Sequence, residues 1–177
     1  MLGLPPLVVA RVVDTPPWQV TVKSCRIAEN QFSLEGPMEI AEAKEFLRHS
    51  HHGCLVARKK DGSLQMTLVS PVLGVDGNVI ITARDITYKV KNIKRNPQIS
   101  LLVYGDKFNG SNYIQIDGKA EVIPYPQAMD IVLDWHRQIR GEPKSWDDIK
   151  QKTLAEGRIA IRVTIERVGP QSRTRGG

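Results

Sequence analysis

Short β-like runs separated by tight-turn signals dominate this chain and limit the folds open to it. Asp61-Gly62 and Asp76-Gly77 are pairs that tolerate the backbone angles of tight hairpins. Strands joined mostly by hairpins form a mainly antiparallel sheet, and short strands favour closure into a small barrel. We therefore predict a mainly β, α+β fold with six antiparallel strands. The predicted strands are Gly53–Arg58, Leu64–Leu73, Asn78–Ala83, Gln98–Tyr104, Asn112–Ile123 and Arg158–Val168.

Two residues are predicted to disturb these strands. Pro71 lies within the second strand and indicates an edge position or a bulge, because proline has no N–H to donate. Gly118 predicts a bulge or bend in the fifth strand.

Helical periodicity predicts four peripheral helices. Ile86, Val90 and Ile93 would form the apolar face of a short basic helix that ends before Pro97. Ser145 would cap the last helix, with acidic residues in its first turn. The predicted helices are Glu39–Leu47, Ile86–Arg95, Pro126–Ile139 and the one that Ser145 caps.

Five prolines set the first 37 residues apart from the rest. We interpret residues 1–37 as an N-terminal extension, residues 38–170 as the barrel domain and residues 171–177 as a flexible polar tail. Two β-like runs in the extension, Leu7–Val13 and Trp18–Val22, could pack on the domain edge or be partly disordered.

The chain carries a net charge of +6 and a pI of about 9.4. The surplus could hold an acidic cofactor, bind nucleic acid or aid solubility. The basic residues are spread along the chain with one concentration at Arg84–Arg95, which disfavours nucleic acid.

No apolar run predicts a membrane span, and the N-terminus does not resemble a secretory signal. Cys25 and Cys54 form no C-x-x-C pair, so we predict reduced thiols in a cytoplasmic protein, with Cys54 buried.

The candidate binding site combines a strand end with the start of the basic helix. The hydroxyl of Thr82, the first N–H groups of that helix and Lys89 could converge on one phosphate. Gln65 and Thr67 share a face of the second strand and would form the opposite side. The alternative for the other cations of this helix, Lys91, Lys94 and Arg95, is a solvated face.

At these residues the sequence resembles the split β-barrel family that includes pyridoxamine 5′-phosphate oxidase, from about Glu39 to Gly169. The resemblance implies an FMN-binding-like split barrel. The oxidase's Tyr-Thr pair matches Ile81-Thr82, and its Arg-Lys pair matches Tyr88-Lys89. Its two basic strand residues, which hold the flavin phosphate, match Gln65 and Ser70, so this chain departs from the FMN pattern there.

The F420-dependent reductase branch of that class is more similar. It shares a D-G-x-x-Q turn and strand (Asp61 to Gln65), a K-x-x-N-hydrophobic-x-R-x-P helix (Lys89 to Pro97) and a late G-E-x-x-x-W-D-D segment (Gly141 to Asp148). The resemblance implies deazaflavin F420 as cofactor, FMN as the alternative, and a homodimer with the cofactor in a groove between two barrels. It assigns cofactor contacts to Gln65, Thr67, Thr82, Lys89 and Asn92.

Three functions follow in order of preference. The first is an oxidoreductase that transfers a hydride from reduced F420 to a small unsaturated substrate; the catalytic residues are unknown, because product protonation could come from solvent. The second is a non-catalytic barrel that binds flavin or haem. The third is a nucleic-acid-binding barrel, which would need exposed aromatic residues on the strands beside the basic ones, and only Tyr104 and Tyr113 are candidates.

A histidine cluster, His49, His51 and His52, lies near Cys54 and suggests zinc. No second Cys/His group lies nearby in the sequence, and cationic residues are common at a helix end. We therefore predict no metal site.

Overall fold

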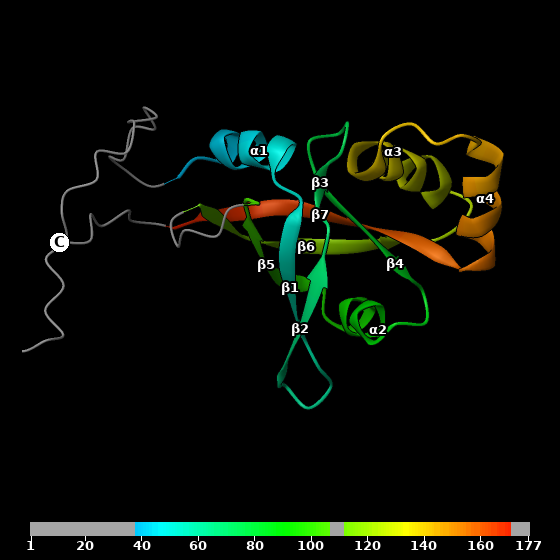
Figure 1. Cartoon of the computed structure of the whole chain (residues 1–177). Helices are drawn as coiled ribbons and strands as arrows, with labels where there is room; N and C mark the ends of the chain where they lie inside the picture. The colour runs from blue at the N-terminus through cyan, green and yellow to red at the C-terminus, as the bar shows by residue number, and fades with distance from the viewer. Residues whose placement is uncertain (1–37, 107–111, 171–177) are drawn as a thin grey trace, which may run out of the picture. The chain divides into compact units, whose positions relative to one another are not determined.

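Seven strands form one antiparallel sheet in the order β2-β1-β5-β6-β7-β4-β3 (Figure 1). The structure is a computed structural model that describes residues 38–106 and 112–170. The strands are β1 (His52–Arg58), β2 (Leu64–Val69), β3 (Val72–Leu73), β4 (Val79–Arg84), β5 (Gln98–Tyr104), β6 (Tyr113–Ile123) and β7 (Arg158–Gly169). The helices in the described ranges are α1 (Ile40–His49), α2 (Tyr88–Arg95), α3 (Ala128–Arg140) and α4 (Trp146–Ala155).

The sheet curls into a half-barrel, which confirms the α+β split-barrel prediction. Strand alternation explains the core: Leu55 of β1, Leu101 of β5 and Ile116 of β6 are all buried and point inward. Leu47 of α1 and Val90 of α2 join the same core cluster. In Figure 1 these two helices lie on opposite sides of the long β6–β7 ribbon.

A second, smaller cluster lies under α3. Ala128 and Val132 of that helix pack with Ile123 and Ala160. Helix α4 contacts α3 and β7, so α3 and α4 together cover the outer side of β7 and β4. The predicted cap of α4 is confirmed, because Ser145 Oγ accepts a hydrogen bond from Asp148 N at 3.2 Å.

The prediction of six strands is wrong, because the predicted strand Leu64–Leu73 is two strands. β2 and β3 lie at opposite edges of the sheet, and the chain crosses between them at Ser70-Pro71. Pro71 has no N–H for a ladder bond, and the Ser70 carbonyl accepts a hydrogen bond from Trp135 Nε1 at 2.8 Å. Gly53 leaves room for the proline ring, since a Cβ there would lie 3.3 Å from Pro71 Cδ.

Two other predictions need correction. The basic helix begins at Tyr88 rather than Ile86, because a turn closed by the Thr87 N to Arg84 O hydrogen bond precedes it. Ile86 is consequently 76% exposed. Cys54 is half-exposed rather than buried, because it points to the outer face of β1. The predicted bulge is confirmed: the β6–β7 register shifts between Asp117 and Gly118.

The predicted extension (residues 1–37, with Cys25), part of the loop between β5 and β6 and the predicted tail (171–177) lie outside the described residues. Within residues 38–106 and 112–170, no helix has both the length and the apolarity needed to cross a membrane.

Candidate functional site

An open groove lies between the β1–β2 turn and helix α2. Its volume is about 700 Å³. Lys59, Lys60 and Asp61 of the turn line one side, Gln65 lies on β2, and α2 contributes the other wall with Tyr88, Asn92 and Arg95. The turn is rigidly built, because Asp61 Oδ1 accepts hydrogen bonds from the Ser63 N–H at 2.9 Å and the Ser63 hydroxyl at 2.7 Å. Three cations against one carboxylate make the groove basic.

Asn92 organises the centre of this groove. Its side chain is 5% exposed, and its Nδ2 donates to Gln65 Oε1 at 2.7 Å across 27 positions of sequence. Its Oδ1 accepts hydrogen bonds from Nη1 and Nη2 of the Arg95 guanidinium, each at 2.9 Å. Because Gln65 Oε1 accepts from Asn92, the two N–H groups of the Gln65 amide remain as donors. They have no partner among the described residues. The network therefore fixes a neutral donor beside a cation at the groove.

Lys89 lies beside this network on α2, three residues before Asn92. It is half-buried, and burial lowers the pKa of its ammonium below the ordinary value of 10.5. No carboxylate pairs with it in the described part of the chain. The start of α2 is also uncapped by any side chain, because the Thr87 hydroxyl donates to the Arg84 carbonyl instead. Both features favour an anion at this end of the helix.

The other four predicted residues lie in four different settings. Thr67 shares the inner face of β2 with Gln65 and is half-buried. Ser70 follows β2, and its carbonyl is bonded to Trp135. The Ile81 side chain is 1% exposed in the barrel core, whereas Thr82 points to the opposite face of β4, across from Ala160. The structure therefore brings Gln65, Tyr88 and Asn92 into one groove, with Lys89 next to Tyr88 on the helix. The other four predicted residues lie outside its lining: Thr67, Ser70, Ile81 and Thr82.

Comparison with known protein families places the chain. The family model described as pyridoxamine 5′-phosphate oxidase matches residues 40–172. The chain belongs to the pyridoxamine 5′-phosphate oxidase family. That match covers the barrel, both groove walls and helices α3 and α4.

Solved structures in this family's fold resemble the chain at low identity. A conserved hypothetical protein from Mycobacterium tuberculosis has a TM-score of 0.63 at 20% identity, over 84% of this chain and 98% of that one. An F420 reductase has a TM-score of 0.57 at 21% identity, over 71% and 94%. The haem storage protein HutZ from Vibrio cholerae has a TM-score of 0.57 at 16% identity, over 75% and 94%. These likenesses show the shared fold.

Sequence reasoning missed Arg95, Lys59 and Lys60 as residues of the groove. A solvated helix face is one reading of Arg95 from the sequence, but its guanidinium is held by Asn92. The signal available was the spacing of three between Asn92 and Arg95, which puts both on one side of a helix. No sequence signal connects Lys59 and Lys60 to α2, because the contact is long-range.

His49, His51 and His52 are the residues that could suggest a metal site, and each lies close to another polar group. His51 Nδ1 lies 3.1 Å from the Pro71 carbonyl, His52 pairs with Asp106 at 3.1 Å, and His49 lies 3.3 Å from Glu45. Over residues 38–106 and 112–170, no group of three His, Cys, Asp or Glu side chains is arranged to hold a metal ion.

A Lys89→Met variant is expected to be more stable than the unaltered protein when no ligand is bound. Burial lowers the pKa of Lys89 in the folded state, so the unfolded state holds the proton more tightly and Lys89 destabilises the fold. This penalty is fully present below the lowered pKa and disappears as pH rises to the unfolded value of 10.5. Thermal unfolding at neutral pH should show a higher Tm for Lys89→Met, and the gain should shrink towards pH 10.5.

Lys94→Met is the matched control, because Lys94 is on the same helix but pairs with Asp85 at 2.7 Å and is 51% exposed. It should not raise the Tm. Equal Tm values for Lys89→Met and the unaltered protein at every pH would show that Lys89 is fully hydrated.

Proposed function

We propose that this chain is an oxidoreductase that uses reduced deazaflavin F420 to transfer a hydride to a small unsaturated organic substrate, with FMN as the alternative cofactor. The observation that carries the proposal is the basic groove of Gln65, Asn92 and Arg95 beside a half-buried Lys89 that pairs with no carboxylate among residues 38–106 and 112–170. Family membership supports it, as does the likeness to a protein described as an F420 reductase.

The donor set fits an anionic, flat cofactor. Lys89 and the uncapped start of α2 would hold a phosphate group. The Gln65 N–H groups would donate to carbonyl oxygens of the ring system, and Asn92 would keep Gln65 in place. When bound, the reduced cofactor supplies the hydride, and the protein supplies orientation and electrostatics. No side chain is assigned as acid or base, so solvent would protonate the product.

We propose deazaflavin rather than FMN as the cofactor because of the residues at positions 65 and 70. Gln65 and Ser70 stand where the oxidase carries the two basic residues that grip the flavin phosphate. Gln65 is held by Asn92 in a neutral network, and the chain at Ser70 is held by Trp135, so neither position offers a cation. The retained Lys89 would serve the phosphate of either cofactor.

A non-catalytic barrel that binds flavin or haem is the second candidate. The likeness to a haem storage protein favours it, as does the lack of an assigned acid or base. Turnover separates the two functions. Protein mixed with reduced F420 and a panel of electron-poor alkenes should oxidise many equivalents of F420, with matching loss of the alkene. Tight binding without any acceptor-dependent oxidation would instead support storage.

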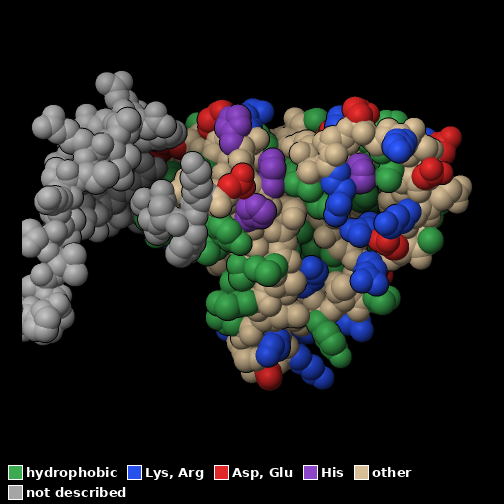
Figure 2. All heavy atoms as spheres, viewed as in Figure 1, with side chains coloured by type: hydrophobic (Ala, Val, Ile, Leu, Met, Phe, Trp, Pro, Cys, Tyr) green, Lys and Arg blue, Asp and Glu red, His purple; other side chains and the backbone are tan. Residues whose placement is uncertain are grey.

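We also propose that the chain forms a homodimer through the outer face of β2, β1 and β5. The outward residues of β2 are all apolar and exposed: Leu64 at 53%, Met66 at 71% and Leu68 at 77%. Cys54 of β1 stands between Leu68 and Leu102 of β5 in the ladder, which extends the patch across three strands. Figure 2 shows hydrophobic side chains gathered on this side of the sheet.

The surroundings of this patch resemble the polar rim of an interface. Asp117 on the neighbouring β6 accepts hydrogen bonds from Ser100 at 2.6 Å and from Arg167 at 2.7 Å. An apolar centre on an unpaired edge strand is a hazard for a monomer. A second copy of the same patch, related by a two-fold axis, would cover it and bring each groove near the partner barrel.

A further inference from the structure

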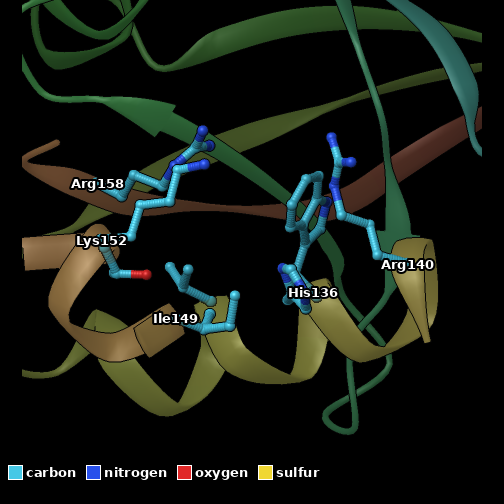
Figure 3. Close-up of a pocket in the computed structure, with 8 residues that line it drawn as sticks. His136, Arg140, Ile149, Lys152 and Arg158 are labelled. Carbon is cyan, nitrogen blue, oxygen red and sulfur yellow. The ribbon is translucent and has the colours of Figure 1, made fainter. Parts of the chain in front are cut away.

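A second cavity lies between α3, α4 and the start of β7, away from the groove. Its volume is about 210 Å³, which corresponds to about seven water molecules at ~30 Å³ each. None of the groove residues lines it. We name it the α3–α4 cavity; Figure 3 shows residues of both helices and of β7 around it.

Four basic side chains line the α3–α4 cavity: His136 and Arg140 of α3, Lys152 of α4 and Arg158 of β7. Among the described residues, no carboxylate is part of the lining. Figure 2 shows Lys and Arg side chains gathered over this side of the molecule. Cations that line one cavity from three elements repel one another, so they raise the potential inside the cavity.

The available negative charge does not balance these cations. Glu156 binds Arg158 Nε at 2.7 Å and lies 3.9 Å from Lys152. Arg140 has no carboxylate partner in the described ranges. Burial lowers the pKa of His136, and the charges of Arg140, Arg158 and Lys152 lower it further. The same three cations therefore act on one imidazole at the cavity wall.

The remaining walls are apolar and fixed. Val132 and Ile149 contribute aliphatic surface, and Trp135 contributes an indole ring. That ring cannot rotate freely, because its Nε1 donates to the Ser70 carbonyl at 2.8 Å. Thr153, which is 5% exposed, adds a hydroxyl to the lining. Binding sites of this kind combine an apolar surface with a few polar groups that fix orientation.

We infer that the α3–α4 cavity binds a small organic anion, with a phosphate or carboxylate held by Arg140, Arg158 and Lys152 and a flat apolar body against Trp135. The anion would relieve the repulsion among the cations and would accept a hydrogen bond from His136. This inference does not rest on the proposed redox function, because the site shares no residue with the groove.

Phenyl phosphate is the probe, and phenol is the ring-matched neutral control. The ring resonances of His136 are followed by NMR as pH is varied, with and without each compound. Phenyl phosphate should bind in the millimolar range, raise the pKa of His136 and shift the Ile149 methyl signals. Phenol should leave the His136 titration unchanged.

Arg140→Gln should weaken phenyl phosphate binding about tenfold, since it removes one charge-assisted contact. Arg140 is exposed and has no carboxylate partner among the described residues, so the variant should fold. Arg137→Gln is the control: Arg137 is on the same helix but stacks on Trp146 at 4.9 Å and pairs with Glu142 at 2.7 Å. An unchanged His136 titration, an equal response to phenol, or full affinity in Arg140→Gln would overturn the inference.

Discussion

A Leu68→Asp variant is expected to be a monomer at concentrations where we expect the unaltered protein to form the proposed homodimer. Leu68 is 77% exposed and lies at the outer face of an edge strand, beside the exposed Met66. Burying a leucine side chain contributes about 1.5–3 kcal/mol, and a two-fold interface contains the residue twice, so the loss is roughly 3–6 kcal/mol per dimer. That loss corresponds to a dissociation constant raised about 10²- to 10⁴-fold.

Sedimentation velocity measures this effect directly. Leu154→Asp is the matched control, because Leu154 is 43% exposed on α4, outside the patch. It should leave the dimer intact. If the unaltered protein sediments as a monomer at high concentration, or Leu68→Asp remains as dimeric as Leu154→Asp, the outer face of β2 is not the interface.

Gly118→Val is expected to destabilise the fold strongly. Gly118 lies at the β6–β7 register shift, where a Cβ would overlap the Thr164 carbonyl oxygen and lie 3.1 Å from Val163 Cγ1. The obstacle is backbone, which cannot move aside without breaking the ladder of the two longest strands. Overpacking costs about 1–3 kcal/mol when side chains can adjust, so we expect at least the upper end of that range.

For a chain of this size, ~3 kcal/mol lowers the Tm by roughly 6–12 °C. Thermal unfolding of the ligand-free protein is the measurement. Lys119→Val is the control, because it places the same side chain on the same strand at an exposed position. A Tm for Gly118→Val that matches Lys119→Val would show that β6 and β7 do not approach as closely as described.

Local signals predicted most of the sheet. Gly62 and Gly77 have positive φ values in the turns that Asp-Gly pairs indicated, and Ser145 caps α4 as its sequence suggests. The division of Leu64–Leu73 into strands at opposite edges was not predictable from periodicity. It depends on the packing of Pro71 against Gly53 and on a hydrogen bond from Trp135, 65 positions away.

The candidate site was predictable only in part. The helix motif indicated Tyr88, Lys89 and Asn92, and the strand motif indicated Gln65. The hydrogen bond between Asn92 and Gln65 spans 27 positions and has no local signature. Ile81 is a predicted site residue whose side chain cannot contact a ligand. Strand alternation points that side chain into the core, so only the Ile81 backbone could bind one. The α3–α4 cavity joins residues from three elements and appears only once the helices are packed.

We expect Lys89 and the adjoining groove to hold deazaflavin F420. Fluorescence titration of the ligand-free protein with F420, and separately with FMN, measures this binding. We predict micromolar or tighter binding of F420, weaker binding of FMN, and F420 affinity about 10- to 100-fold lower in Lys89→Ala, as expected for loss of a hydrogen bond to a charged group worth roughly 1.5–3 kcal/mol. The Lys94→Ala control should bind like the unaltered protein. Binding of neither cofactor, or F420 binding that Lys89→Ala leaves unchanged, would show that Lys89 and this groove do not hold F420.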